Sequence, residues 1–409
     1  MAEESAGEFI AGIYAEAWSR IVATMIRFTG GDWNLAEDCA QDAFAQALRT
    51  WPQDGVPRQP LAWLTTAARN RAIDRMRRAT RDAVKARAWA AWEQRHEPPA
   101  YRSDAEIPDE RLELMFTCCH PALNLDAQVA LTLRSLAGLS TAQIARAFLV
   151  PERTMGQRIF RAKQKIAHAV IPLRVPPAHL LPERLPGVLH VLYLLFNEGY
   201  GAAGDREALS REAIRLARVL VALMPDEPEA LGMLALMLLH DARRPARFDA
   251  DGELVTLEDQ DRSRWDRDLI AEGGAVLERA LRRRRAGPFQ IQAAIAACHA
   301  TAPYARQTDW PQIVALYGRL ARVAPSPVVE LNRAVAISMA RSPEAALPLV
   351  EAIAESGRLE GYYLLHATRA DLLRRCGRAE EADACLRSAL ALAPTDAERR
   401  LLSRRLAAH

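Results

Sequence analysis

The polar and apolar positions along the chain repeat mainly with the period of an α-helix. Ala, Leu, Arg and Glu dominate long stretches in which apolar residues recur every three or four positions, and alternating strand patterns are scarce. Proline clusters interrupt these stretches, most clearly at 171–187, where five prolines fall within seventeen residues. We therefore expect an all-α protein whose helical blocks are separated by proline-rich, non-helical connectors.

The segment 34–51 is the first strongly patterned helix. One side of it is apolar, formed by Leu35, Cys39, Ala43 and Ala47 and broadened by Phe44 and Leu48. The opposite side is polar and acidic, with Glu37, Asp38, Gln41 and Asp42. A solvated surface is the ordinary interpretation of such a face, so the pattern alone does not indicate a binding site.

The segment that follows is strongly basic. Between Arg58 and Arg95, ten Lys and Arg residues stand against three Asp and Glu residues, a local net charge of +7. A basic stripe of this density, with Trp63 nearby, can follow a phosphate backbone and stack on unpaired bases. A solvated basic helix remains the alternative when this stretch is considered alone.

Residues 123–166 have the pattern of a helix-turn-helix. An apolar helix ends at Gly138, which suits a left-handed C-cap, and Ser140 or Thr141 can cap the short helix that follows. Pro151 then suits the start of a last helix, which we expect to bury Met155, Ile159 and Ile166. The side chains expected to be exposed are polar or basic: Arg153, Thr154, Gln157, Arg158, Arg161, Lys163 and Lys165. Arg and Gln can read base edges in the major groove, so this pattern indicates DNA binding.

Beyond the second proline cluster the chain shows a weak internal repeat. Pro225, Pro325 and Pro394 each close a similar Ala/Leu-rich helix, and the last two lie 69 residues apart, close to two tetratricopeptide periods. The final unit fits that pattern best, with Gly377 at the turn of a helical pair. An ordinary helical hairpin is the alternative interpretation, and both predict a helical array.

Composition excludes several classes. The net charge is only +3 over 409 residues, no apolar run is long enough to span a membrane, and the amino-terminal residues lack the pattern of a signal peptide. The six cysteines are scattered, so we expect a cytoplasmic protein without disulfides. Cys118-Cys119-His120 invites a metal or redox interpretation, but plain packing is the preferred one. No catalytic constellation emerges, so we expect no enzyme activity, no metal and no cofactor.

Taken together, these segments resemble the extracytoplasmic-function (group IV) sigma factors of the bacterial sigma-70 family. Residues 36–48 are similar to the region 2.2 helix, residues 63–78 to regions 2.3 and 2.4, and residues 128–166 to region 4. TCCHPALN (117–124) and the phrase at 185–202 are typical of a sub-group with a long, helical, tetratricopeptide-like carboxy-terminal extension.

The resemblance implies roles for single residues. Contacts with core RNA polymerase, at the β′ clamp helices, fall to Asp38, Gln41, Asp42 and Phe44. Binding and melting of the −10 element fall to the loop 52–60 and to Arg58, Trp63, Asn70, Asp74, Arg77 and Arg78. Reading of the −35 element falls to Arg153, Thr154, Gln157, Arg158, Arg161 and Lys165. The β flap of the polymerase is a further expected partner.

The implied organisation has five parts: region 2 at 1–79, a linker at 80–109, region 4 at 110–170, a proline-rich connector at 171–187 and the extension at 188–409. The function implied is a sigma factor whose extension regulates it in cis and binds a protein or peptide. Two other classes stay open. One is a stand-alone helix-turn-helix regulator with a sensor domain, and the other is a scaffold whose repeats bind a peptide.

Overall fold

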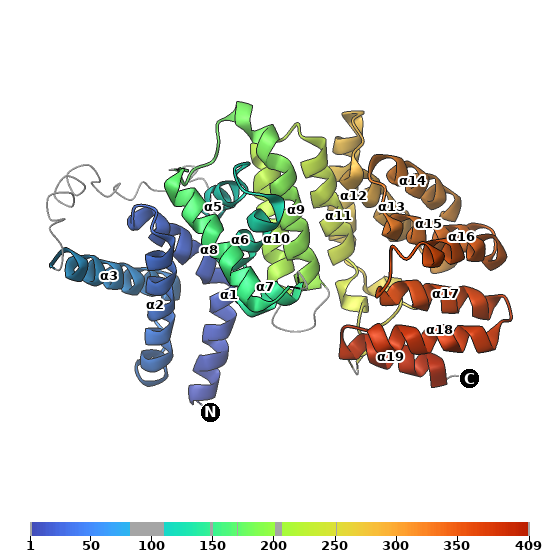
Figure 1. The fold of residues 1–409 in the computed structure, drawn as a ribbon, viewed down its shortest axis with the longest axis horizontal. Helices are drawn as coiled ribbons and strands as arrows, with labels where there is room; N and C mark the ends of the chain where they lie inside the picture. Colours follow the sequence, from blue (N-terminus) through green and yellow to red (C-terminus); the bar gives the residue numbers. More distant parts are fainter. Residues whose placement is uncertain are drawn as a thin grey trace. The chain divides into compact units, whose positions relative to one another are not determined.

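The computed structural model describes residues 2–81, 110–147, 150–169, 171–200, 207–250 and 252–407 (Figure 1). Within these ranges every regular element is a helix, apart from one isolated β-bridge between Phe248 and Leu254. The expected all-α class is therefore confirmed. The chain divides into two compact units, Met1–Val219 and Leu220–His409.

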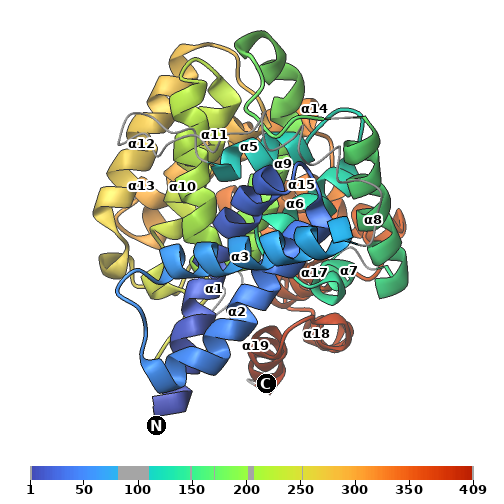
Figure 2. The same ribbon diagram turned by 90° about the vertical axis from the view of Figure 1, so that its left-hand side faces the viewer.

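The first unit begins with three helices that pack on one another. They are α1 (Ala2–Phe28), α2 (Trp33–Asp54) and α3 (Pro60–Arg81). Figure 2 shows α3 crossing α2. Small side chains allow this close approach: the buried side of α2 carries Ala36, Ala40, Ala43 and Ala47, and α1 contributes the large buried residues Trp18, Ile21 and Met25.

The same unit continues with three shorter helices and three longer ones. They are α5 (Glu110–Cys118), α6 (Leu125–Ser135), α7 (Thr141–Ala147), α8 (Glu152–His168), α9 (Leu181–Tyr200) and α10 (Glu207–Leu223), whose last residues belong to the second unit. Helix α6 is buried on nearly all sides and contacts α8 and α9. Of the linker expected at 80–109, residues 82–109 lie outside the described residues.

The proline-rich segment 171–187 differs from the expected connector. It is irregular only at its start: a 3-10 turn covers Ala178–Leu180, and α9 then begins at Leu181 and continues through Pro186. A proline in a helix removes one backbone hydrogen bond, and packing can offset that loss. Here Arg184 donates to the carbonyl oxygen of Phe116 at 2.9 Å, which ties the first turns of α9 to α5. Helix α9 thus lies within the first compact unit.

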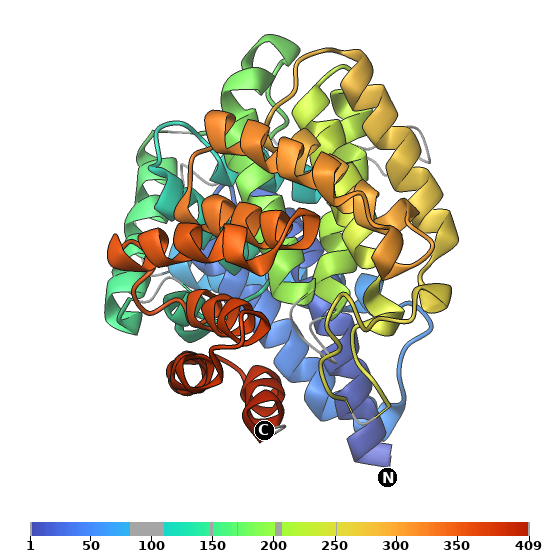
Figure 3. The same cartoon turned by 90° about the vertical axis from the view of Figure 1, so that its right-hand side faces the viewer.

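The second unit contains nine helices within its described residues. They are α11 (Pro228–Asp241), α12 (Arg267–Arg282), α13 (Pro288–Thr301), α14 (Trp310–Val323), α15 (Pro327–Ala340), α16 (Pro343–Glu355), α17 (Tyr363–Arg375), α18 (Ala379–Leu392) and α19 (Asp396–Ala407). Each packs mainly on its neighbours in sequence, and Figure 3 shows the later helices, orange to red, following one another in this way.

The helical pair expected near the carboxy-terminal end is present. Gly377 adopts φ +77°, a left-handed conformation, between α17 and α18, and the facing sides of the pair bury Ala370, Leu373, Ala382 and Leu386. The hairpin is confirmed, whereas its tetratricopeptide identity stays a prediction.

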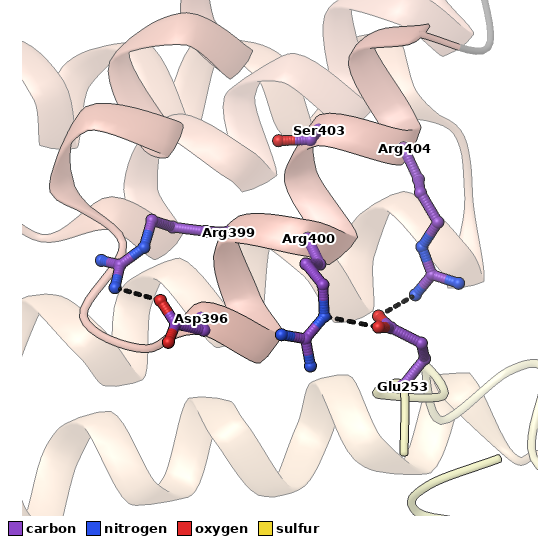
Figure 4. Close-up of a pocket in the computed structure, with 6 residues that line it drawn as sticks. All are labelled: Glu253, Asp396, Arg399, Arg400, Ser403 and Arg404. Carbon is purple, nitrogen blue, oxygen red and sulfur yellow. Dashed lines mark hydrogen bonds and ion pairs between the residues drawn. The ribbon is translucent and has the colours of Figure 1, made fainter. Parts of the chain in front are cut away.

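A clasp joins distant parts of the second unit. The connection between α11 and α12 turns back on itself at the Phe248–Leu254 bridge and presents Glu253 to α19. Arg400 and Arg404 both form ion pairs with this carboxylate, and they line a hollow of about 540 Å³ together with Asp396, Arg399 and Ser403 (Figure 4). Throughout the described residues, each helix is too short or too polar to cross a bilayer.

Candidate functional site

Helix α2 presents its polar side as predicted, with one exception. Asp32 caps the helix by accepting hydrogen bonds from the backbone N–H groups of Asn34 and Leu35. Asp38 and Gln41 are exposed and Asp42 is half-exposed. Glu37, expected on the same face, is only 5% exposed and points into the protein.

The two aspartates on this face are joined to α3. Arg75 donates to Asp38 at 2.9 Å and to Asp42 at 2.8 Å, and the hydrogen bond to Asp38 is the main cause that raises the pKa of Arg75. All three side chains keep substantial contact with solvent, so this is a surface network. The acidic face is therefore accessible but partly neutralised.

Phe44 occupies the core and not the surface. Its ring lies 4.7 Å from that of Tyr14 and 6.3 Å from that of Trp18, centroid to centroid, and the residue is 4% exposed. The apolar residue that α2 does expose is Leu48, at 52%. A contact of Phe44 with another protein would require it to leave this aromatic cluster. The helical pattern placed both residues at the margin of the apolar side, so it could not tell them apart.

The loop expected at 52–60 near the −10 element is shorter in the structure, because α2 continues to Asp54 and α3 begins at Pro60. The loop between them is 55–59. Gly55 ends α2 at φ +82°, and Arg58 is exposed a few residues later. Trp63, in the first turn of α3, is half-buried because its ring packs edge-on against Trp51, 5.4 Å away. The contact with Trp51 thus fixes the ring of Trp63, which keeps part of its surface exposed.

The outer side of α3 carries the other residues expected there. Asn70, Asp74, Arg77 and Arg78 are all exposed, and their spacing of four, three and one places them on one side of the helix. Arg69, one residue away, packs over the ring of Phe28 at 5.1 Å from its centroid. The expected basic residues Lys85, Arg87 and Arg95 lie outside the described residues.

The helix-turn-helix forms where the sequence predicts it. Gly138 adopts φ +66° after α6. Ser140 and Gln143 then cap each other, because the Ser140 Oγ accepts from the Gln143 backbone at 3.2 Å and the Gln143 Oε1 accepts from the Ser140 backbone at 2.8 Å. Helix α8 starts directly after Pro151 and buries Met155, Ile159, Ala162 and Ile166.

The opposite side of α8 is open to solvent. Arg153, Thr154, Gln157, Arg161 and Lys165 are exposed, and Arg158 is partly buried beside Asp126, 3.4 Å away. The first three lie in the first two turns, which is the part of a recognition helix that contacts base edges. Phe160 is also exposed on this helix, which the sequence pattern did not lead us to expect.

Lys163 contradicts the predicted exposure. Its side chain is 10% exposed and its Nζ lies 2.7 Å from a carboxylate oxygen of Glu37 in α2. Lys163 follows the buried Ile159 by four residues and precedes the buried Ile166 by three, so its spacing already placed it on the inner side of the helix. The position of Lys163 on the helix, and not its charge, thus decides its burial.

The two adjacent cysteines are packing residues. Cys118 and Cys119 are both fully buried, and burial raises the pKa of the Cys119 thiol to about 12. A thiol with so high a pKa holds very little thiolate, which is the reactive and metal-binding form. Among the described residues, no group of three or more His, Cys, Asp or Glu side chains is placed to hold a metal ion.

Comparisons with known proteins agree with this arrangement. The family model of sigma-70 region 2 matches residues 14–82, that of sigma-70 region 4 matches residues 113–166, and a family of unknown function, DUF6596, matches residues 184–281. No solved structure matches the chain.

Two relatives extend the comparison. An uncharacterized protein of Rhizobium meliloti (strain 1021) is 48% identical over 372 residues, which are 89% of this chain and 88% of that protein. The RNA polymerase sigma-H factor of Pseudomonas aeruginosa is 31% identical over 163 residues, which are 38% of this chain and 82% of that factor. With both sigma regions matched in order, the chain belongs to the sigma-70 family of RNA polymerase sigma factors.

Proposed function

We propose that the protein is an extracytoplasmic-function sigma factor that directs core RNA polymerase to a specific promoter in the cytoplasm. In this proposal the acidic face of α2 docks on the β′ clamp helices, α8 reads duplex DNA at −35, and α3 with loop 55–59 opens and holds the −10 strand. The polymerase supplies the RNA-forming chemistry, and this chain supplies placement and melting.

One observation carries the proposal: a single chain presents both an exposed acidic face and an exposed recognition helix. Asp38 and Gln41 on α2 suit a basic protein surface, whereas Arg153 and Gln157 on α8 suit base edges. A stand-alone regulator needs the second surface and not the first. The residues between the two matched sigma regions, 83–112, are few, which supports the extracytoplasmic-function group.

Transcription in vitro with purified core polymerase tests the proposal. We expect promoter-specific transcript with the full chain and a loss of polymerase binding when Asp38→Asn and Asp42→Asn are combined. Glu360→Gln with Glu380→Gln, two exposed carboxylates of the second unit, is the matched control and should leave binding unchanged. If the full chain binds duplex promoter DNA tightly but never binds polymerase, a stand-alone regulator takes the place of a sigma factor.

We further propose that the helices of the second unit regulate initiation in cis and bind a protein or peptide, as tetratricopeptide-like arrays do. The hollow lined by Arg399, Arg400 and Arg404 supports a partner with polar groups, because its arginines are already paired with Asp396 and Glu253. A truncation after residue 170 is a poor test, because it would also remove α9 from α5 and α6. Arg400→Ala with Arg404→Ala in the full chain leaves the first unit intact, and a changed transcript yield would support the regulatory role.

A further inference from the structure

Exposed arginines gather at the carboxy-terminal end of α12, in the second unit. Residues 278–285 carry five arginines and one glutamate, a local net charge of +4. Four of the arginines are exposed and form no ion pair within the described residues: Arg279, Arg282, Arg284 and Arg285. We call these four residues the arginine cluster.

The connection that carries the cluster is held by its neighbours. Helices α11, α12 and α13 pack side by side (Figure 2). Arg283, the fifth arginine, forms an ion pair with Asp226, just before α11. Gln290 of α13 donates from its Nε2 to the carbonyl oxygen of Arg285 at 2.7 Å and to Oε1 of Glu229 at 3.0 Å. A backbone fixed in this way loses little entropy when its side chains bind a partner.

Arg284 has a backbone conformation that an arginine disfavours. Its φ is +54°, and among the described residues every other position with a positive φ is a glycine. Glycine fills a left-handed position after a helix without strain. The dipole of α12 accounts for a basic residue in its last turn, such as Arg282, but not for an arginine where a glycine would relieve strain. The Arg284 side chain therefore points to a role outside the fold.

A partner of the arginine cluster must offer negative charges at close spacing, because Arg282, Arg284 and Arg285 fall within four consecutive positions. The backbone of duplex DNA carries one charge for about every 1.7 Å of its axis. An arginine can bind phosphate oxygens through two parallel hydrogen bonds. The proposed function already brings promoter DNA to this chain through α8.

We propose that the arginine cluster binds phosphates of promoter DNA outside the −35 element, so that the second unit adds sequence-independent affinity to the base contacts of α8. This inference rests on the proposed function, because the holoenzyme holds the chain on promoter DNA. It gives the second unit a contact with nucleic acid in addition to the protein or peptide partner proposed above.

Two matched variants test this contact in the full chain. The test variant replaces three members of the arginine cluster: Arg282→Gln, Arg284→Gln and Arg285→Gln. The control variant removes the same charge from three other exposed arginines of the second unit that form no ion pair within the described residues: Arg319→Gln, Arg358→Gln and Arg387→Gln.

Fluorescence anisotropy of the holoenzyme on labelled promoter DNA compares these variants at several salt concentrations. The test variant should bind about tenfold more weakly and reduce the slope of log K against log salt by about two to three, since each phosphate contact contributes about 0.9. The control variant should behave like wild type. Equal effects of the two variants would mean that only net charge matters and would overturn the proposal.

The DNA itself shows whether phosphates are the groups that are bound. In a second duplex, methylphosphonate linkages replace the charged phosphates outside the −35 element. On this duplex the test variant should bind as tightly as wild type, because the contact is already lost in both. If the test variant remains about tenfold weaker on the uncharged duplex, the arginine cluster does not bind the DNA backbone.

Arg284→Gly separates binding from folding. Glycine relieves the left-handed strain, so the thermal midpoint should stay constant or rise, whereas DNA affinity should fall severalfold. A lower midpoint with unchanged DNA affinity would show that Arg284 serves the fold and would exclude it from the proposed contact.

Binding to core polymerase without DNA separates this inference from the proposed function. If the test variant loses affinity for the polymerase itself, the arginine cluster binds an acidic protein surface, and the proposal is wrong while the sigma function stands. If the wild-type chain never binds polymerase, the sigma function is wrong. The free full chain on the same two duplexes at low salt then shows whether the arginine cluster contacts DNA.

Discussion

Gly138 and Trp18 pack so closely that a side chain at Gly138 would crowd the Trp18 ring. The backbone there has φ +66°, which disfavours any residue with a Cβ, and an added Cβ would meet the Trp18 ring at 3.0 Å. The turn of the helix-turn-helix therefore packs directly on α1, because Gly138 has no side chain.

Gly138→Ala should lower the free energy of unfolding by about 2–4 kcal/mol, because left-handed backbone strain and the steric clash add together. Urea unfolding followed by Trp fluorescence measures this change. Gly357→Ala is the matched control: it has φ +67° with open space around the new Cβ. It should cost only the backbone strain, about 1–2 kcal/mol. Equal losses in the two variants would mean that the Trp18 contact has no energetic weight.

Substitutions on α8 should separate base reading from phosphate binding. Gln157→Ala should cost about 1–3 kcal/mol at the cognate −35 sequence and little at unrelated sequences, as expected of a base-edge contact. Lys165→Ala should weaken binding to all sequences alike and reduce the salt slope by about one. Fluorescence anisotropy of the holoenzyme on labelled promoter DNA, at several salt concentrations, distinguishes the two patterns. Similar behaviour of both variants would contradict the assignment.

His299 should make the second unit sensitive to acid. Burial, followed by the nearby Arg243 and Arg262, lowers the pKa of His299 to about 4. The unfolded chain therefore binds a proton below pH about 6.5 that the folded chain binds only near pH 4, so stability falls as the pH is lowered through this window, by up to about 2–3 kcal/mol.

Thermal unfolding between pH 4.5 and 7.5 checks this dependence. His299→Gln should make the curve shallower, and the slope that remains comes from the buried His240, whose pKa burial also lowers. His190→Gln, at an exposed position of the first unit, should leave the curve unchanged. A wild-type midpoint that stays constant across the window would refute the role of His299.

Alkylation of the folded protein should modify exposed cysteines faster than buried ones. Cys118 and Cys119 are buried thiols with a raised pKa, so iodoacetamide at pH 7.5 should modify them only after unfolding in urea. Cys376 is only partly buried and should react first. Peptide mass spectrometry after a timed reaction gives the order, and rapid native labelling of Cys118 would contradict the packing role.

Local signals in the sequence predicted much of the fold. The helix at 34–51, the left-handed Gly138, the Ser140 cap and the start of α8 after Pro151 all depend on residues a few positions apart. Interactions between residues a few positions apart can be predicted from the sequence, and the structure confirms these elements.

The structure differs from the sequence predictions where the environment of a residue depends on a partner far away in the chain. Lys163 is buried because Glu37, 126 positions earlier, supplies a carboxylate, and the position of Phe44 depends on rings contributed by α1. Neither partner can be identified from the helical period. Pro186 lies inside a helix because α9 packs on α6, which offsets the lost hydrogen bond. The sequence indicates which residue types form the binding surfaces. It does not indicate which of these residues form ion pairs with one another inside the protein.

The clasp at Glu253 has a consequence for how the chain is made. Synthesis proceeds from the amino terminus, so Glu253 leaves the ribosome nearly 150 residues before Arg400, its partner on α19. During that interval its carboxylate has neither of its two arginines, although the helices between can already pack on their neighbours. The clasp can thus close only after α19 has been synthesised, well after the α11–α12 connection that carries Glu253.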